Sequence, residues 1–364
     1  MESLIEGIMA RGGATDDEAA ETASHLVGAN LAGHDSHGIA RITRYHAWLK
    51  DGTLKPGTDP KAIVDTPALI QFDGQRGIGQ YLCAAATRAG IERAKANGSA
   101  IVAMRRAGHI GRLGHYAEMA AEGGIVSIQF CNVAGSLLVA PYGAAQRTMS
   151  TNPVAVGIPN GPDDPFILDF ATAYVAEGKA LVAATGGKAL PDDALVGADG
   201  VRTGDPEALY GASAFTALPD ASGGTGALRT MGEHKGSGLA LACDLLAGVL
   251  TGNGTNAGDE PFGNGWLAIF VEPSRLDDTS RFTAGVMDYV HMVRTAKLAD
   301  GFDKVRIPGD VERETRAERL ANGIPLSPVL LDAILSIAAE LSVDFERDSL
   351  LVSPHSDAPR PATD

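Results

Sequence analysis

The spacing of apolar positions near the start of the chain is helical. Apolar residues recur three and four positions apart over residues 16–32, which predicts a helix, and Thr15 before it is a suitable N-cap. A second helix is predicted over residues 40–52. A Pro-rich stretch with two short strand-like runs follows at residues 52–74. We therefore expect a mainly helical region up to about residue 72.

The middle of the chain, residues 73–295, alternates between segments with helical spacing of apolar residues and segments typical of strands. Helical patterns are followed by short apolar runs bounded by glycine or polar residues, which predicts an α/β domain whose helices cover a sheet. Helices are predicted at residues 79–98, 115–124 and 235–252. Strands are predicted at residues 99–106, 125–132, 164–172 and 266–273, and after the turn at 150–153. Residues 186–230, rich in Gly, Ala and Asp, are expected to be mostly loops.

The last part of the chain returns to helical patterns. Alternating charges over residues 308–323 are typical of an exposed helix, and residues 327–342 are amphipathic. Residues 346–364 have the composition of a disordered tail. We therefore expect a helical domain from residues 1–72 with 296–345 and an α/β cofactor-binding domain over 73–295.

Composition excludes several classes of partner. A net charge of −15 disfavours nucleic acid, which requires a basic surface. No apolar run approaches the length of a membrane span, and no basic start followed by an apolar run resembles a signal peptide, so a cytoplasmic protein is expected. The three cysteines are widely spaced without metal-ligand spacing. We expect them to be reduced core residues, and we expect no metal.

The densest group of reactive side chains lies in "NLAGHDSHGIARITRYHAWL", residues 30–49. His37, Arg41 and Tyr45 are four residues apart and share one face if residues 37–45 are helical. A guanidinium fork for a carboxylate and an imidazole for proton transfer suit a 2-hydroxy or 2-oxo acid. Taken alone, a His between Ser36 and a glycine is more often a turn element, and that alternative stays open here.

Three further positions combine a polar group with the end of an element. His109 follows the predicted strand 99–106, and the carboxyl ends of strands are where α/β sheets place their chemistry. Asp169 ends an apolar strand, where a carboxylate needs a partner. His234 and Lys235 precede an apolar helix whose N-terminus favours anions. A turn histidine, a capped carboxylate and a solvated lysine are the structural alternatives. Neither a GxGxxG fingerprint nor a P-loop is present, so a Rossmann fold is not indicated.

In this order the motifs resemble the type-2 malate/L-lactate dehydrogenase family. The resemblance implies an NAD- or NADP-dependent oxidoreductase that interconverts a small 2-hydroxy carboxylate and its 2-oxo acid. It also implies a non-Rossmann mixed-sheet cofactor domain, a helical domain formed by both chain ends, and a homodimer. The matching segments are "NLAGHDSHGIARITRY", "GHIGRLGHYAEMAAEGGIVSIQF", "APYGAAQRTMSTNPVAVGIP", "ILDFATAYVAEGK", "GADGVRTGDP", "EHKGSGLALACDLLAGVLTG" and "RAERLANGIPL".

The resemblance also implies roles for individual residues. The substrate is held by Arg41 and Tyr45. Catalytic roles fall on Ser36, His37, His109 and Asp169. Cofactor contacts fall on His37, Asp169, Phe170, Ala171, Thr172, His234 and Lys235. Arg316, on the predicted exposed helix, is a further candidate for the adenine end of the cofactor, with a solvated helix face as the alternative.

Some alternatives remain open at this point. Either His37 or His109 is the acid/base, and Ser150 and Ser237 depart from the family pattern, which leaves the choice between NAD and NADP open. A reductase of a cyclic imine carboxylate needs the same carboxylate fork. A non-catalytic binding protein with the family fold is a third possibility, which the intact site motifs disfavour.

Overall fold

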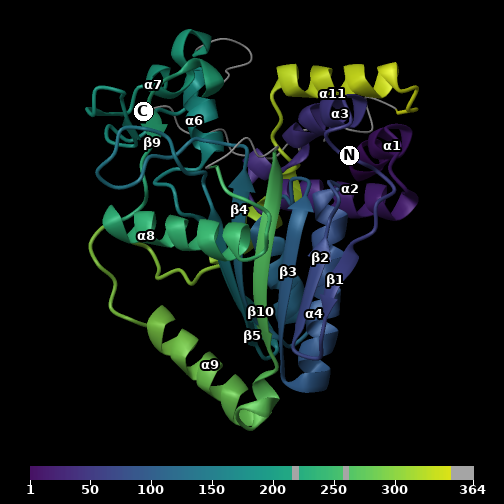
Figure 1. The fold of residues 1–364 in the computed structure, drawn as a ribbon. Coiled ribbons are helices and arrows are strands. Elements are labelled where there is room, and N and C mark those ends of the chain that lie inside the picture. Colours follow the sequence, from purple (N-terminus) through teal and green to yellow (C-terminus); the bar gives the residue numbers. More distant parts are fainter. Residues whose placement is uncertain (215–220, 257–261, 346–364) are drawn as a thin grey trace.

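The computed structural model describes residues 1–214, 221–256 and 262–345, so the predicted disordered tail at 346–364 lies outside the described residues. Its centre is a twisted seven-stranded sheet with the strand order β1-β2-β3-β10-β4-β5-β6 (Figure 1). The strands are β1 (Lys61–Asp65), β2 (Leu69–Asp73), β3 (Ser99–Ala107), β4 (Val126–Ala134), β5 (Pro153–Asn160), β6 (Asp163–Ala171) and β10 (Gly263–Val271). The sheet thus begins at Lys61.

The sheet is mixed. β2 and β3 run parallel, whereas the other pairs are antiparallel. The last strand in the sequence, β10, lies between β3 and β4 at the centre of the sheet. The expectation of a non-Rossmann, mixed-sheet α/β fold is therefore confirmed.

Two helices, α4 (Gly79–Asn97) and α5 (Leu113–Glu122), cover one face of this sheet. Side chains alternate along a strand, so every second residue of the central strands meets these helices. The packing is close: a Cβ on Gly90 of α4 would lie 2.5 Å from the Phe270 ring. The buried strand residues of this core include Val102, Met104, Ala155, Ile167, Trp266, Ala268 and Phe270.

A helical lobe built from both ends of the described chain packs on the upper part of the sheet (Figure 1). It contains α1 (Glu2–Arg11), α2 (Asp16–Leu31), α3 (Ile42–Lys50) and α11 (Pro328–Glu340), and α10 (Asp310–Asn322) packs on α2. The predicted N-cap of α2 is present as a full capping box, with the Glu18 amide donating to Thr15 Oγ1 at 3.3 Å and the Thr15 amide donating to Glu18. The sequence patterns did not predict α1.

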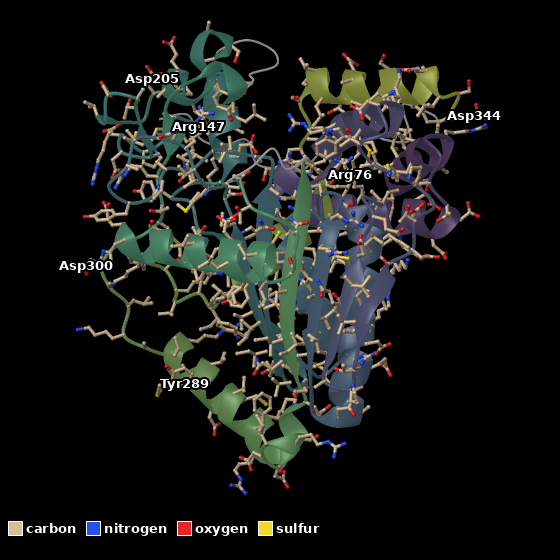
Figure 2. All side chains as sticks on the ribbon, viewed as in Figure 1. Arg76, Arg147, Asp205, Tyr289, Asp300 and Asp344 are labelled. Carbon is tan, nitrogen blue, oxygen red and sulfur yellow. The ribbon has the colours of Figure 1, made fainter. Side chains whose placement is uncertain are left out.

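A second lobe forms beside the upper end of the sheet from residues between 138 and 240. Arg147, labelled in Figure 2, holds it together by donating to the carbonyl oxygens of Ala221, Leu209 and Gly224 at 2.6, 2.8 and 2.9 Å. The region predicted to be mostly loops, residues 186–230, therefore contains short elements, and the half-buried Arg147 guanidinium binds part of it. The short elements are β7 (Leu195–Val196), β8 (Arg202–Thr203), α7 (Glu207–Tyr210) and β9 (Ala227–Leu228), and α6 (Glu177–Ala184) precedes them in the same lobe.

The opposite face of the sheet is crossed by α8 (His234–Cys243), which continues as a π-helix, η5 (Asp244–Val249), against β4 and β10 (Figure 1). A single helix was predicted here. The last long helix of this region, α9 (Thr279–Arg294), follows β10 at the lower end of the sheet. Among the described residues, no helix is long and apolar enough to cross a membrane.

Candidate active site

The segment that carries the first site motif is not one helix. Two 3-10 turns, η1 (Asp35–His37) and η2 (Ile39–Arg41), precede α3, and Gly38 between them is extended with φ −89° and ψ −157°. A Cβ on Gly38 would lie 2.1 Å from Asn30 Oδ1, so a glycine is required there. The condition for a single stripe of His37, Arg41 and Tyr45, a helix over residues 37–45, is therefore not met, because the chain bends around Asn30.

Asn30 and Arg319 hold this bend in place. The Asn30 side chain donates to Asp35 Oδ1 at 2.6 Å and accepts from the Ile39 amide at 2.7 Å. Arg319 reaches over from α10 and donates to Asp35 Oδ2 at 3.0 Å. The two ends of the chain thus meet at the site, a pairing that spacing along the sequence cannot reveal.

His109 is the centre of a compact aromatic group. It lies two residues beyond β3, as predicted, and its Nδ1 is 2.6 Å from the Tyr45 hydroxyl. Gln80 Nε2 donates to the same hydroxyl at 2.6 Å, and the Tyr45 oxygen has a second lone pair that can accept the His109 Nδ1–H, the tautomer that leaves His109 Nε2 as a proton acceptor. The His37 ring stacks on His109 with the ring centroids 5.6 Å apart. Both candidate acid/base groups therefore share one pocket.

Ser36 and Arg41 complete this side of the pocket. Ser36 Oγ is 3.1 Å from His37 Nδ1, and Arg41 Nε donates to the Ser36 carbonyl oxygen at 2.5 Å. Arg41 Nη2 is also 3.8 Å from a Glu177 carboxylate oxygen of α6. A Cβ on Gly178 would lie 2.2 Å from Ser36 Cβ, so the second lobe closes tightly on the loop.

Burial determines the protonation of these groups. Desolvation, with the nearby Arg41 charge as a smaller cause, lowers the pKa of His37 to about 3 and that of His109 well below its usual value. Desolvation raises the pKa of Tyr45 to about 12. Both imidazoles are therefore neutral near pH 7 and Tyr45 keeps its proton, which leaves the rings able to accept a proton from a hydroxyl group.

Asp169 ends β6 beside the N-terminus of α5. The Gly114 amide donates to Asp169 Oδ2 at 2.9 Å, and burial raises the pKa of this carboxyl. Arg112, only 4% exposed, pairs with Glu118, while its Nε and Nη1 have no partner in the structure. A Cβ on Gly114 would lie 2.6 Å from Asp169 Oδ2 and 2.9 Å from Arg112 Nη1. The carboxyl and the guanidinium therefore face the same point.

The remaining predicted cofactor residues lie around the end of β6. Thr172 follows Phe170 and Ala171 and donates from Oγ1 to the Thr151 carbonyl oxygen at 3.0 Å. The Met231 amide donates to the Thr172 carbonyl oxygen at 2.9 Å, which brings the start of α8, with His234 and Lys235 exposed in its first turn, next to β6. Arg316 is exposed on α10, whereas its neighbour Arg319 contacts the site loop.

These residues fit a nicotinamide nucleotide. The unpartnered donors of Arg112 beside Asp169 are suited to polar groups of a ligand, and an exposed lysine at a helix N-terminus is suited to a phosphate. Within the described ranges, no group of three or more His, Cys, Asp or Glu side chains is placed to hold a metal ion. A pocket of about 240 Å³ between the end of α5 and α9 lies at the opposite end of the sheet.

Comparison with known proteins agrees with this arrangement. The malate/L-lactate dehydrogenase family model matches residues 1–335. L-lactate dehydrogenase of Cupriavidus necator is 33% identical over 93% of this chain and 96% of its own. Hydroxycarboxylate dehydrogenase B of Escherichia coli O157:H7 is 34% identical over 95% of this chain and 94% of its own. The structure of delta1-piperideine-2-carboxylate reductase from Pseudomonas syringae superposes with a TM-score of 0.79, at 30% identity over 93% of this chain and 97% of that one.

The mixed sheet and the histidine pocket thus define an oxidoreductase fold other than the Rossmann fold. The chain belongs to the malate/L-lactate dehydrogenase family. Sequence reasoning found the two histidines and Asp169, but it missed Asn30, Gln80, Arg112 and Arg319. Residue type and spacing indicate no role for these four, although Asn30, Arg112 and Arg319 lie within the matching segments, and they become recognisable only through the contacts of the folded chain.

Proposed function

We propose that this chain interconverts a 2-hydroxy carboxylate and the matching 2-oxo acid, with NAD or NADP as the hydride carrier. The observation that carries the proposal is the pocket in which His109 is bonded to Tyr45 and stacked on His37, with Arg41 beside them. The relatives include proteins named lactate, malate and hydroxycarboxylate dehydrogenases, which supports the same substrate class.

In the oxidising direction a neutral imidazole accepts the proton of the substrate hydroxyl group. We assign this role to His109, because its ring is held by Tyr45, which is in turn held by Gln80. The His37 ring stacks on His109, and its Nδ1 contacts only the Ser36 hydroxyl among the described side chains. Arg41 is the carboxylate ligand, since a guanidinium can bind both carboxylate oxygens. The bound nicotinamide would supply the hydride acceptor.

This arrangement changes the expectation for Tyr45. Its side chain is 1% exposed, and its hydroxyl is already shared between His109 and Gln80. The contact between Tyr45 and the substrate carboxylate stays a prediction, and it is disfavoured because the hydroxyl already has two partners. We therefore propose that Tyr45 orients His109 and that Arg41 carries the carboxylate contact.

The cofactor would be held by residues at the end of β6 and the start of α8. Asp169 borders the point where Arg112 has unpartnered donors, Phe170 and Thr172 follow it in the chain, and Lys235 is available for a phosphate. Titrating the protein with NADH and with NADPH, followed by nucleotide fluorescence, measures both affinities directly.

The reaction itself is tested with a substrate panel. Purified protein should oxidise NADH or NADPH in the presence of at least one of pyruvate, phenylpyruvate and oxaloacetate, with no added metal. His109→Gln should lower kcat about 10²- to 10⁴-fold, as expected for lost general acid–base catalysis. A wild-type rate in His109→Gln together with a large loss in His37→Gln would move the acid/base role to His37.

A second substrate class is supported by the piperideine-2-carboxylate reductase structure, whose fold this chain shares. A cyclic imine carboxylate presents the same carboxylate to Arg41 and a ring nitrogen in place of the 2-oxo oxygen. A higher kcat/KM for piperideine-2-carboxylate than for every 2-oxo acid would favour this class. If no panel member is reduced although NAD(P)H binds, the chain is a non-catalytic binding protein.

We also propose that the chain forms a homodimer, because one sheet face carries a row of exposed and half-buried apolar side chains. Residues in direct cross-strand register on five neighbouring strands form it: Ile101, Ile269, Ile128, Val156 and Leu168. Ile101 and Ile128 are 40% and 38% exposed although they lie on inner strands. Exposed apolar side chains of α8, η5 and the turn after it extend this surface: Leu241, Leu245, Val249 and Leu250. Exposed apolar side chains on neighbouring elements of this kind favour an interface.

The homodimer is tested by light scattering during size-exclusion chromatography. Ile128→Glu should shift the protein from dimer to monomer, because a carboxylate in the centre of the row opposes burial. Ile63→Glu is the matched control, since Ile63 is 39% exposed but lies on the edge strand β1. A wild-type monomer, or equal behaviour of the two variants, would contradict this interface.

A further inference from the structure

The loop that carries His109 is held by buried side chains that have no assigned part in catalysis or cofactor binding. The Ile110 amide, next to His109 in the chain, donates to Asn264 Oδ1 at 2.9 Å. The Ile110 carbonyl oxygen accepts from the Tyr116 hydroxyl at 2.5 Å. One peptide unit away, the Arg112 amide donates to His25 Nε2 at 2.8 Å. Both sides of residue 110 are therefore fixed by side chains rather than by a strand ladder.

Asn264 occupies an unusual place in the sheet. It lies near the start of the central strand β10, opposite Ala107 at the end of β3, where the pairing register shifts before Trp266. Its side chain is 1% exposed, and its Nδ2 donates to the Asn132 carbonyl oxygen of β4 at 3.0 Å. The amide group therefore spans from β4 to the loop beyond β3 and continues the hydrogen bonding after the ladder has ended.

Asn132 in turn is tied into the sheet and the loop after η5. Its Oδ1 accepts from Asn253 Nδ2 at 3.0 Å and from the Gly265 amide at 3.1 Å, and its Nδ2 donates to the Gly254 carbonyl oxygen at 2.9 Å. Asn132, to which Asn264 donates on the β4 side, is thus itself held by these three hydrogen bonds. On the other side of the loop, a Cβ on Gly79 would lie 2.4 Å from the His109 carbonyl oxygen, so α4 leaves no room for displacement.

We infer that Asn264 is a positioning residue that places the His109 ring against Tyr45 and His37 by holding the Ile110 amide. Among the described hydrogen bonds, the Asn264 side chain reaches only backbone groups and none of these three rings, so it acts through the backbone. Its effect on rate rests on the proposed role of His109, but its effect on the position of His109 does not. Loss of this bond leaves a buried amide without an acceptor and lets the loop relax, and a displacement of about 1 Å in a catalytic group lowers rates by up to about 10²-fold.

The test compares three variants. Asn264→Ala removes both hydrogen bonds and should lower kcat about 10- to 100-fold with little change in NAD(P)H affinity. Asn264→Asp keeps an oxygen acceptor for the Ile110 amide but buries an acidic group, so it should be more active than Asn264→Ala while being less stable to heat. Tyr116→Phe removes only the bond to the Ile110 carbonyl oxygen and should lower kcat about 2- to 10-fold, the equivalent of one neutral hydrogen bond.

Asn160→Ala is the matched control for loss of a buried asparagine. Asn160 is 4% exposed and donates to the Asp164 carbonyl oxygen at 3.2 Å, at the opposite end of the sheet. This variant should lose stability but keep kcat. If kcat follows melting temperature across all four variants, or if Asn264→Ala keeps the wild-type kcat and His109 signals, Asn264 has only a structural role and the inference is overturned.

A spectroscopic measurement separates this inference from the proposed function. The imidazole signals of His109, assigned with His109→Gln in histidine-labelled protein, should shift in Asn264→Ala and stay in place in Asn160→Ala. Shifted signals with a wild-type kcat would uphold the positioning role and contradict the catalytic role of His109. Unshifted signals would contradict the positioning role, whatever the activity of His109→Gln.

Discussion

The strongest single prediction concerns the Tyr45 hydroxyl. It takes part in two hydrogen bonds of 2.6 Å, one with His109 Nδ1 and one with Gln80 Nε2, inside a side chain that is 1% exposed. Tyr45→Phe keeps the ring and removes both bonds. Each polar group left buried without a partner costs about 1–3 kcal/mol, so the free energy of unfolding should fall by a few kcal/mol at most.

The effect on catalysis should exceed what the lost stability explains. Without the hydroxyl, the His109 ring is free to turn within the stack against His37, and kcat should fall about 10- to 100-fold. The KM for the cofactor should hardly change, because none of the cofactor residues contacts Tyr45 among the described interactions. Steady-state oxidation of NAD(P)H with a 2-oxo acid and guanidinium unfolding measure the two effects.

Two further variants make this prediction refutable. Tyr289→Phe is the control, since Tyr289 is 65% exposed on α9, which lies at the lower end of the sheet in Figure 2. Gln80→Leu should be non-additive with Tyr45→Phe, because both remove the same bond. If Tyr45→Phe keeps kcat within about twofold of wild type while stability drops by a few kcal/mol, the hydroxyl is structural and His109 is oriented by other groups.

Three other measurements test the site. Arg41→Lys keeps the charge but loses the two-pronged geometry, so the substrate KM should rise and kcat should fall in steady-state kinetics. Lys235→Ala should raise the cofactor KM by a factor equivalent to about 1–3 kcal/mol and leave the 2-oxo acid KM unchanged. The pKa of His37 is about 3 in the fold against 6.5 in the unfolded chain. Between these values the unfolded chain binds a proton that the folded chain does not, so the fold loses stability as pH falls from 6.5 towards 3. Unfolding free energy should fall over this window by up to about 1.4 kcal/mol per pH unit from this group, and His37→Gln should flatten the slope.

The layered fold could be predicted because its elements carry strong periodic patterns. The predicted strand at 99–106 is β3, and the predicted helix at 79–98 is α4, each within one residue at both ends. The patterns cannot show which strands pair. The strand β10 comes last in the sequence and lies at the centre of the sheet, because pairing depends on contacts that are far apart along the chain.

The candidate site could be predicted only in part for the same reason. His37 and His109 stand out by residue type, and the structure places their rings together. The helical stripe from His37 to Tyr45 failed because Asn30 accepts the Ile39 amide and bends the chain at Gly38. A side chain that competes with the backbone for hydrogen bonds overrides helical spacing, and residue spacing alone gives no sign of it.

Backbone conformation is a further reason why the structure at the site end of the sheet could not be predicted from local sequence patterns. The described residues other than glycine with positive φ at this end include Arg106 at 53°, Asn152 at 34° and Glu233 at 60°. Each one comes directly before or within a few residues of a functional segment, namely the His109 loop, strand β5 and the start of α8. Such conformations cost about 1–3 kcal/mol each and persist only where the surroundings impose them.

The surroundings are visible for each of these residues. The Arg106 amide donates to Asn253 Oδ1 at 2.7 Å, and Asn152 Nδ2 donates to the Ala240 carbonyl oxygen at 3.1 Å. Glu233 is held by Arg229 and Arg202. The packing of the α4–α5 core therefore offsets the cost of these three strained residues, which lie next to the segments that carry the site. Because strain of this kind depends on partners from other elements, the site is determined by the assembled fold and not by any one motif.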